Sequence, residues 1–252
     1  MGNLVLNALP AAERDWLSAR AQDILVKRHQ LLHVTGEKLA WHYFPLDCLL
    51  AVYGVAPNGE TAEYTILAAE GFTGVSATLG DARSIGNAIV IVEGVCTRVS
   101  VSVLREACQA GGLLPQLLLR YASMRAFHLS QASLCRSHHP VNKRLARWLL
   151  QCFDRLPEPV LQLTHERLAT VLGVRREAVS LALHELHKTS AIASRRGQIA
   201  LKDRDRLEAR ACECYAAFSA ELRKLLVDVE ELAPSKGSQA KYTDGAFSSK
   251  RR

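Results

Sequence analysis

The sequence of 252 residues lacks any long run of apolar residues. None approaches the roughly 18 residues of a membrane-spanning helix, and no basic stretch precedes the first apolar residues, so we expect neither a membrane anchor nor a secretion signal. Hydrophobic residues make up 48% of the chain and charged residues 23%. This composition excludes a disordered or collagen-like chain and predicts a soluble, globular protein. The odd number of scattered cysteines predicts a reducing, cytoplasmic environment.

Sequence patterns for metal sites are also missing. The seven cysteines include no Cys-x-x-Cys pair, and none precedes Cys48, which removes support for an N-terminal iron–sulfur cluster or a zinc finger. Their odd number argues against a secreted disulfide framework. No His-x-His occurs, and a metal-dependent cupin enzyme would need it. We therefore expect no metal, no other cofactor and no catalytic residues.

Two small groups of metal-ligating residues have simpler explanations. Cys212 and Cys214 are expected on a helix, where positions i and i+2 point to different faces and are poorly placed to hold one ion. His184 and His187 lie one helical turn apart and are interpreted as packing or solvated side chains. His138-His139 are expected at a hinge.

Charge is distributed unevenly along the chain. Residues 1–133 have a net charge of −1, residues 134–210 a net charge of +7, and residues 211–252 a net charge of +1. A basic segment beside a neutral one is typical of a module that binds a polyanion.

The N-terminal part, residues 1–110, has the pattern of a β domain. A helix is expected at 10–18. Short β-rich apolar runs follow, separated by turn formers, and Asn58-Gly59 between two of them predicts a hairpin. The runs are Leu31–Val34, Leu39–Phe44, Leu49–Val55, Ala62–Leu67, Ala88–Val92 and Cys96–Val101. This spacing is typical of a sandwich or jelly roll.

Residues 111–137 predict a long helix that is apolar over much of its circumference. One stripe has a spacing suited to a dimer contact, coiled-coil fashion: Leu114, Leu117, Tyr121, Met124 and His128. An overlapping stripe contains Leu113, Leu117, Arg120, Met124 and Phe127. We expect this helix to make a homodimer, with a merely buried helix as the alternative.

Residues 138–210 contain a winged helix-turn-helix pattern. Thr164 is a candidate N-cap for a first helix, Gly173 a tight turn, and a second helix follows with Ala178, Val179, Ala182, Leu183 and Leu186 inward. Residues 191–201 then predict a hairpin with a basic tip. A helix is expected over 211–233, and residues 234–252 are expected to be a disordered basic tail.

These motifs resemble the Crp/Fnr family of bacterial transcription regulators. The matching residues are Leu163-Thr164-x-Glu166-x-Leu168-Ala169, Gly173, Arg176-Glu177-x-Val179-Ser180 and Arg196-Gly197-x-Ile199. The resemblance is strong in the helix-turn-helix and architectural upstream. It implies an α+β fold with an N-terminal β jelly-roll (cyclic-nucleotide-binding-like) domain, a long dimerisation helix and a C-terminal winged helix-turn-helix.

The resemblance implies that the second helix reads bases in double-stranded DNA. By the family pattern the base-reading residues are Arg176, Glu177 and Ser180, and Leu181, where the family usually has Arg, could contact a thymine methyl group. Phosphate contacts are expected from Thr164, His165, Arg175, Arg195, Arg196, Lys143 and Arg144. Arg175 stands where Ser or Thr commonly caps the helix, a loss of about 1 kcal/mol.

The family's cyclic-nucleotide cassette is degenerate here. Arg83 and Ser84 match its phosphate-binding pair, but Val75 replaces the Glu that follows Gly74 and cannot accept a hydrogen bond from a ribose hydroxyl. We expect these four positions to line an effector pocket for an unidentified small molecule other than cAMP. Arg83 could instead pair with Asp81. Haem has no marked axial ligand among His29, His33 and His42.

The sequence thus predicts a dimeric, sequence-specific transcription regulator, with RNA polymerase as a candidate partner. Two alternatives stay open. One is an effector-independent DNA-binding protein that uses its degenerate domain only for dimerisation. The other is a cupin-like enzyme with an accessory helix-turn-helix.

Overall fold

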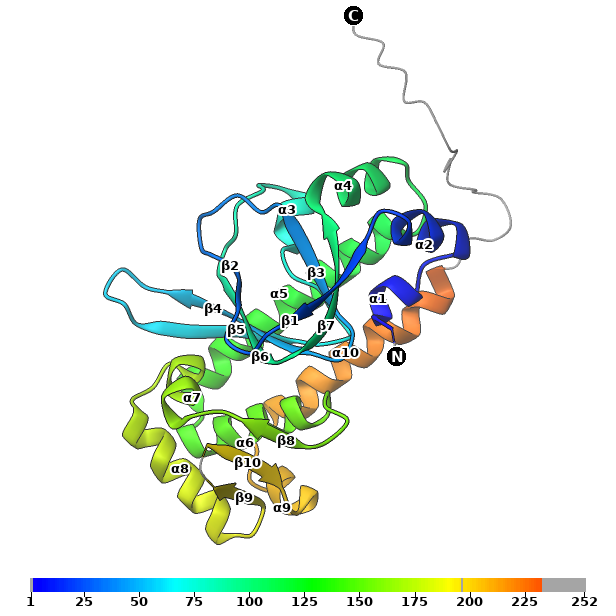
Figure 1. Cartoon of the computed structure of the whole chain (residues 1–252). Coiled ribbons are helices and arrows are strands. Elements are labelled where there is room, and N and C mark those ends of the chain that lie inside the picture. Colours follow the sequence, from blue (N-terminus) through cyan, green and yellow to red (C-terminus); the bar gives the residue numbers. More distant parts are fainter. Residues whose placement is uncertain (1, 196, 233–252) are drawn as a thin grey trace, which may run out of the picture.

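The computed structural model describes residues 2–195 and 197–232 (Figure 1). Two antiparallel sheets form an N-terminal domain, a long helix runs behind them, and a winged helical domain lies at the lower end of the view. The predicted α+β class and the order of its parts are confirmed. Within the described ranges, no helix is both long and apolar enough to cross a membrane.

The N-terminal domain contains seven strands and four short helices. Strands β1, β7 and β3 form one sheet, and β2, β6, β4 and β5 form the other. The elements are α1 (Leu4–Asn7), α2 (Ala11–Ser18), β1 (Gln22–Val26), β2 (Leu31–His33), β3 (Trp41–Pro45), β4 (Leu49–Val55), β5 (Thr61–Leu67), α3 (Val75–Leu79), β6 (Asn87–Val92), β7 (Gly94–Ser100) and α4 (Val101–Gln109).

Most of these elements were expected from the sequence. The helix at 10–18 is α2, and the Asn58-Gly59 hairpin joins β4 to β5, with Gly59 in the left-handed region at φ +83°. Three elements were missed. Helix α1 has only four residues, too few for an apolar periodicity. Strand β1 pairs with β7 although most of its side chains are exposed, so it shows little apolar alternation. Helix α3 lies within the degenerate cassette, where no helix was expected.

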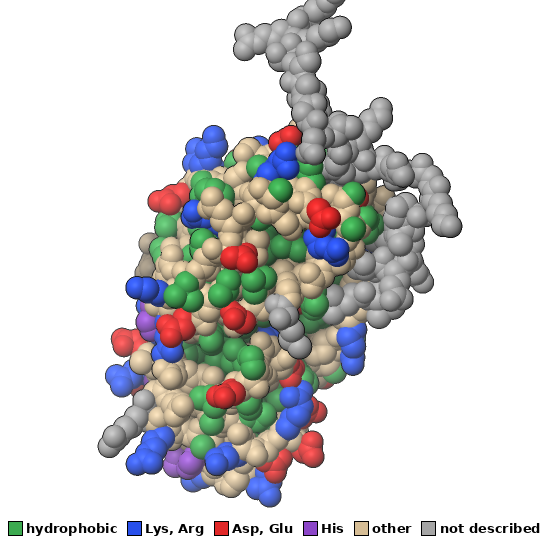
Figure 2. Space-filling model, turned by 45° about the vertical axis from the view of Figure 1, so that its right-hand side comes forward, with side chains coloured by type: hydrophobic (Ala, Val, Ile, Leu, Met, Phe, Trp, Pro, Cys, Tyr) green, Lys and Arg blue, Asp and Glu red, His purple; other side chains and the backbone are tan. Residues whose placement is uncertain are grey.

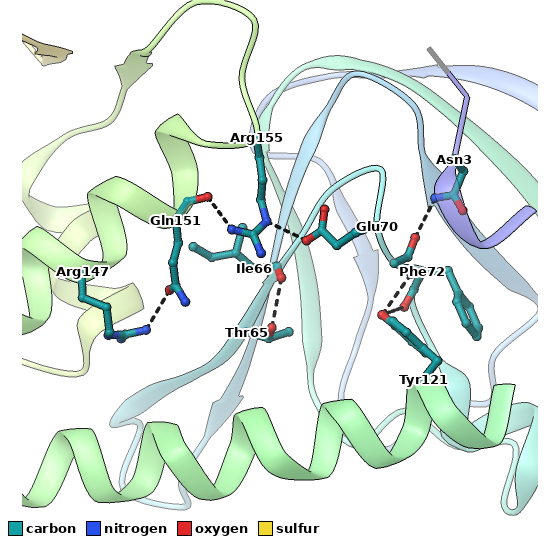
Figure 3. Close-up of polar contacts among 10 residues, drawn as sticks. Asn3, Thr65, Ile66, Glu70, Phe72, Tyr121, Arg147, Gln151 and Arg155 are labelled. Carbon is teal, nitrogen blue, oxygen red and sulfur yellow. Dashed lines mark hydrogen bonds and ion pairs between the residues drawn. The ribbon is translucent and has the colours of Figure 1, made fainter. Parts of the chain in front are cut away.

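Helix α5 (Leu114–His138) is fastened to the N-terminal domain along its first half. The Tyr121 ring stacks on Phe72 at a centroid distance of 4.8 Å, and its hydroxyl bonds both the N–H and the carbonyl of Phe72 at 3.0 Å (Figure 3). At the helix start, the buried Glu13 carboxylate accepts hydrogen bonds from the N–H groups of Leu113 and Leu114 at 2.9 and 3.0 Å. A side chain from α2 thus satisfies the amides that begin α5.

The C-terminal domain continues from α5 through a sharp turn at Pro140. Its elements are α6 (Val141–Phe153), β8 (Val160–Gln162), α7 (His165–Leu172), α8 (Arg176–Lys188), β9 (Ile192–Arg195), β10 (Gln198–Leu201), α9 (Arg204–Glu208) and α10 (Cys214–Leu232). The three strands pair in the order β8-β10-β9. Helix α10 then folds back along α5 toward α1 (Figure 1).

The winged domain packs against the outer face of the larger N-terminal sheet. The Arg155 guanidinium donates to the Glu70 carboxylate at 2.6 Å, and both side chains are largely buried (Figure 3). The Thr61 hydroxyl on β5 donates to the Thr170 carbonyl on α7 at 2.7 Å. One apolar core contains Ile66 of β5 together with Trp148 of α6, so the two domains share a core.

Candidate DNA-binding surface

Helix α7 is built as its sequence predicts. The Thr164 hydroxyl accepts a hydrogen bond from the Arg167 N–H at 3.2 Å and caps the helix start. Leu168, Ala169 and Leu172 are buried. The helix ends at Gly173, whose φ of +62° is strained for a residue with a side chain. A Cβ there would also lie 2.6 Å from the Thr61 carbonyl oxygen, so this turn fits closely against β5.

Helix α8 buries one face and exposes its first turns. Val179, Ala182, Leu183 and Leu186 are buried as predicted, whereas Ala178 is half-buried. The Arg175 side chain makes no capping bond within the described chain, which confirms the expected loss of the cap. The N–H groups at the start of α8 are therefore available to an anion such as a DNA phosphate.

The four expected base-reading residues share the N-terminal half of α8. Arg176 and Glu177 are exposed, and Leu181 is 67% exposed, so all three are accessible to a partner. Ser180 is half-buried and has two internal partners. Its hydroxyl donates to the Arg176 carbonyl at 3.1 Å and lies 2.8 Å from Nδ1 of His165 on α7.

The expected phosphate-contacting residues do not all share one surface. Thr164, Arg175 and Arg195 are exposed around the helix-turn-helix and the β9–β10 hairpin, and His165 is half-buried. Arg196 lies outside the described residues. Lys143 is exposed at the start of α6, where its neighbour Asn142 donates to Glu185 at 2.8 Å; this places it beside the second half of α8.

Arg144 was wrongly expected at the surface. It is buried, and its guanidinium donates to the carbonyl of Leu172 at the end of α7. The side chain therefore stabilises the turn between α7 and α8 instead of facing a phosphate. The sequence shows only a basic residue near the start of a helix, and its burial depends on where α7 packs.

Basic side chains recur around the lower end of the molecule in Figure 2, where the winged domain lies. Acidic side chains lie among them. Strand β8 extends the wing to a third strand through Leu161, which pairs with Ile199. This third strand was not predicted from the sequence.

Three of the four residues expected to bind an effector line the same cavity, and the fourth lies outside it. Gly74, Val75 and Ser84 line one small cavity between the sheets and α5, with Arg125 of α5 at its wall. Arg83 is exposed and donates to the Gly36 carbonyl at 2.7 Å, so it does not reach the cavity.

The other three residues of the degenerate cassette are constrained by contacts or backbone conformation within the chain. The Ser84 hydroxyl donates to the Gly86 carbonyl at 2.6 Å. Val75 is the first residue of α3, and Gly74 precedes it at φ +76°. A side chain at Gly74 would be strained in this left-handed conformation, and its Cβ would lie 2.8 Å from Cδ1 of Leu39.

The stripe expected to form the dimer contact faces the protein's own core. Leu114, Leu117, Tyr121, Met124 and His128 are all buried within one chain. The first four pack in the core that contains Phe72, and the His128 ring lies 4.7 Å from Phe218 of α10. Sequence spacing could not separate this face from a dimer face, because α10 returns to α5 from far along the chain.

Four metal-ligating side chains meet where α5 ends and α10 begins. They are Cys135, His139, Cys212 and Cys214. The expectation that Cys212 and Cys214 share a helix is wrong, because α10 begins at Cys214 and Cys212 lies in the preceding loop. The geometry of two residues on one helix therefore does not apply to them.

Comparisons with known proteins agree with this architecture. Residues 143–210 match a family model described as the Crp-like helix-turn-helix domain. A solved structure from Eubacterium rectale, assigned to the crp/fnr family of transcriptional regulators, superposes with a TM-score of 0.63 at 17% identity and covers 81% of this chain and 96% of its own. No curated protein matches the sequence.

Two further solved structures are similarly close. FixK2 of Bradyrhizobium japonicum has a TM-score of 0.61 at 18% identity, covering 76% of this chain and 98% of its own. The c-di-GMP responsive global regulator CLP of Xanthomonas campestris has a TM-score of 0.61 at 14% identity, covering 76% and 99%. Residues 143–210 are thus a Crp-like helix-turn-helix domain, in a chain that has the fold of the Crp/Fnr transcription regulators.

Proposed function

We propose that the chain is a sequence-specific transcription regulator that binds double-stranded DNA as a homodimer in the cytoplasm. The observation that carries the proposal is the exposed first half of α8 in a Crp-like helix-turn-helix. A recognition helix of this kind enters the major groove with its N-terminal residues on the base edges. A symmetric dimer would read two half-sites about 34 Å apart.

Each exposed residue of α8 has a chemistry suited to one contact. The Arg176 guanidinium can donate two hydrogen bonds to guanine O6 and N7, and the Glu177 carboxylate can accept one from cytosine N4. Leu181 offers an apolar contact to a thymine methyl group. The exposed Arg175, Arg195 and Thr164 are our candidates for the phosphate contacts that fix the register of the protein on DNA.

The outward face of α5 is the surface we assign to the dimer. Leu119, Phe127 and Leu134 are exposed on α5, and the small residues Ser123 and Ser130 lie between them. These residues recur at intervals of three and four, so they lie on one side of the helix. An apolar face of this length is suited to a second copy of the same helix.

The effector would bind in the cavity lined by Gly74, Val75 and Ser84. Arg125 lines it as well, and its Nη1 atom is buried without a hydrogen-bond partner in the described chain. Burial lowers the Arg125 pKa, although nearby Glu70 and Glu63 oppose the shift. These features favour a small anion over cAMP, because Arg83 and Ser84 are already bonded to backbone carbonyls. RNA polymerase remains a candidate partner.

The test is selection of genomic DNA fragments by the purified protein at two salt concentrations. The wild type and an Arg176→Ala, Glu177→Ala variant are compared, with Lys188→Ala at the far end of α8 as a matched surface control. We expect a two-fold-symmetric motif from the wild type and the control and none from the double variant. A motif that survives in the double variant would overturn the assignment of α8.

A second experiment separates the effector-dependent regulator from an effector-independent one. Candidate anions, including cAMP and c-di-GMP, are titrated against thermal stability, because a ligand that binds only the folded state raises the melting temperature. Specific stabilisation that is lost in Arg125→Gln supports the effector cavity. Equal melting temperatures with every ligand favour the alternative in which the domain serves only dimerisation.

A further inference from the structure

Four side chains from two separated stretches of the chain converge beside the hinge. Cys135 lies in the last turn of α5, His139 follows the end of that helix, and Cys212 and Cys214 lie just before and at the start of α10. The three thiols are at most 3% exposed. The group therefore joins the long helix, the hinge to the winged domain and the C-terminal helix.

Two of the distances between their ligand atoms match those around a single ion. The Sγ atoms of Cys135 and Cys212 are 3.5 Å apart, Sγ of Cys214 is 3.6 Å from Nδ1 of His139, and all four ligand atoms lie within 4.8 Å of one another. Zinc bonds to sulfur at about 2.3 Å and to imidazole nitrogen at about 2.0–2.1 Å, so a tetrahedral ion separates two sulfur ligands by about 3.8 Å and a sulfur and a nitrogen by about 3.6 Å.

The histidine is oriented for ligation by a partner on its far side. Nε2 of His139 lies 3.0 Å from the Glu213 carboxylate, and that bond requires a proton on Nε2. Nδ1 then carries the free lone pair and faces Cys214. A carboxylate behind a histidine ligand is the usual outer-shell arrangement at zinc sites. The Gln131 amide in addition donates to Sγ of Cys214 at 3.2 Å.

A second pair of buried cysteines shows what is special here. Cys48 and Cys96 also have neighbouring sulfurs, 3.1 Å apart, but they pack among apolar side chains of the sheets. Among the described residues, no third thiol or histidine joins them in a metal-ligating group. At the hinge, by contrast, a third thiol and an imidazole join the pair formed by Cys135 and Cys212.

We propose that Cys135, His139, Cys212 and Cys214 bind one thiophilic divalent cation, Zn²⁺, in a closed tetrahedral site. Three thiolates and one imidazole are a typical set for structural zinc. An iron–sulfur cluster fits less well, because its ligands bind different irons and are spread further apart. Loading forms three Zn–S bonds and one Zn–N bond, releases the thiol protons to solvent and transfers no electron.

The ion would fix the hinge by linking its ends. With all four ligands from protein, no position is left open for a substrate, so the role is structural. Zinc would tie the end of α5 to the start of α10 and hold the winged domain in one orientation relative to the long helix. The site itself does not depend on the proposed DNA-binding function.

The test measures metal binding by the full chain under reducing conditions. The metal-free protein is titrated with Zn²⁺ against a chromogenic chelator, and the loaded protein is examined by zinc X-ray absorption. We expect one ion per chain with three sulfur ligands and one nitrogen. Co²⁺ in place of Zn²⁺ should give the intense absorption of tetrahedral thiolate coordination, a readout that needs no variant.

Variants then assign the ligands. Cys214→Ser and His139→Ala should lose tight binding, Glu213→Gln should weaken it by about 10-fold to 100-fold, and Cys108→Ser, at a half-buried cysteine outside the group, should change nothing. Any of three results would overturn the proposal: no stoichiometric ion in the wild type, full binding in Cys214→Ser, or a disulfide between Cys135 and Cys212 that persists in reductant.

Discussion

The Ser180 hydroxyl on α8 lies 2.8 Å from Nδ1 of His165 on α7. Because this hydroxyl already donates to the Arg176 carbonyl, it accepts the Nδ1 proton of the histidine. Two residues that sequence reasoning assigned to separate DNA contacts are therefore partners of each other. The pair holds the start of α7 against the first turns of α8, where bases would be read.

This relationship predicts that His165 and Ser180 act together. Ser180→Ala and His165→Ala should each weaken specific DNA binding. The loss of affinity in the double variant should be smaller than the sum of the losses in the two single variants. A double-mutant cycle on DNA affinity should give a coupling energy of about 0.5–1.5 kcal/mol. Additive losses would show that the residues contact DNA independently.

The two faces of α5 predict opposite phenotypes. Leu119→Glu, on the exposed face, should leave the chain folded but shift it from dimer to monomer in light scattering, with loss of DNA binding. Leu117→Glu, in the core, should instead unfold the domain, because it places an unpaired charge in an apolar site. A folded monomer produced by the Leu117 variant would show that the dimer contact uses the stripe expected from the sequence.

Tyr121 should contribute to the junction of α5 and the N-terminal domain through its hydroxyl. Tyr121→Phe leaves the buried N–H and carbonyl of Phe72 without this partner, which should lower the free energy of unfolding by about 1–3 kcal/mol. Urea denaturation measures it, with Tyr53→Phe at a half-buried position as the control. Equal losses in both variants would contradict the assigned role of the bond.

Buried histidines predict a loss of stability in mild acid. Burial lowers the pKa of His42 from 6.5 to about 4, and Thr78 and the Thr73 carbonyl bond its neutral ring. As the pH falls below 6.5, His42 binds a proton in the unfolded chain, but in the folded chain it stays neutral until about pH 4. This ring alone should lower the free energy of unfolding by on the order of 3 kcal/mol across that window.

The pH dependence of urea denaturation tests this expectation. His33 also has a pKa lowered to about 4 by burial and should add to the slope. His42→Asn should flatten the slope between pH 6.5 and 4, whereas His184→Asn, at an exposed position, should leave it unchanged. A wild-type slope in His42→Asn would mean that this ring is protonated in the folded protein.

Local signals in the sequence were enough for much of the fold and the helix-turn-helix. The cap at Thr164, the left-handed turn at Gly173 and the hairpin at Asn58-Gly59 each depend on a few adjacent residues, so pattern reasoning found them. The degenerate cassette was noticed for the same reason. The sequence pattern could not show that the Arg83 guanidinium donates a hydrogen bond to the Gly36 carbonyl.

The features that sequence missed depend on contacts between distant segments. The face of α5 that is buried is decided partly by α10, which returns to place Phe218 against His128. Arg144 is buried because its guanidinium donates a hydrogen bond to the Leu172 carbonyl at the end of α7. Cys135 and Cys212 meet only because the winged domain brings the start of α10 back to the end of α5. None of these contacts has a periodic signature.

The central claim is that the first turn of α8 reads bases, and one measurement tests it most directly. The affinities of the wild type and Arg176→Ala are measured for the selected operator and for operators changed at one base pair at a time. We predict that the variant loses about 1–3 kcal/mol on the selected operator and no longer discriminates at one symmetric base pair, while discrimination elsewhere is retained. Uniform weakening on every operator, with discrimination unchanged at all positions, would contradict the account and place Arg176 on the phosphate backbone.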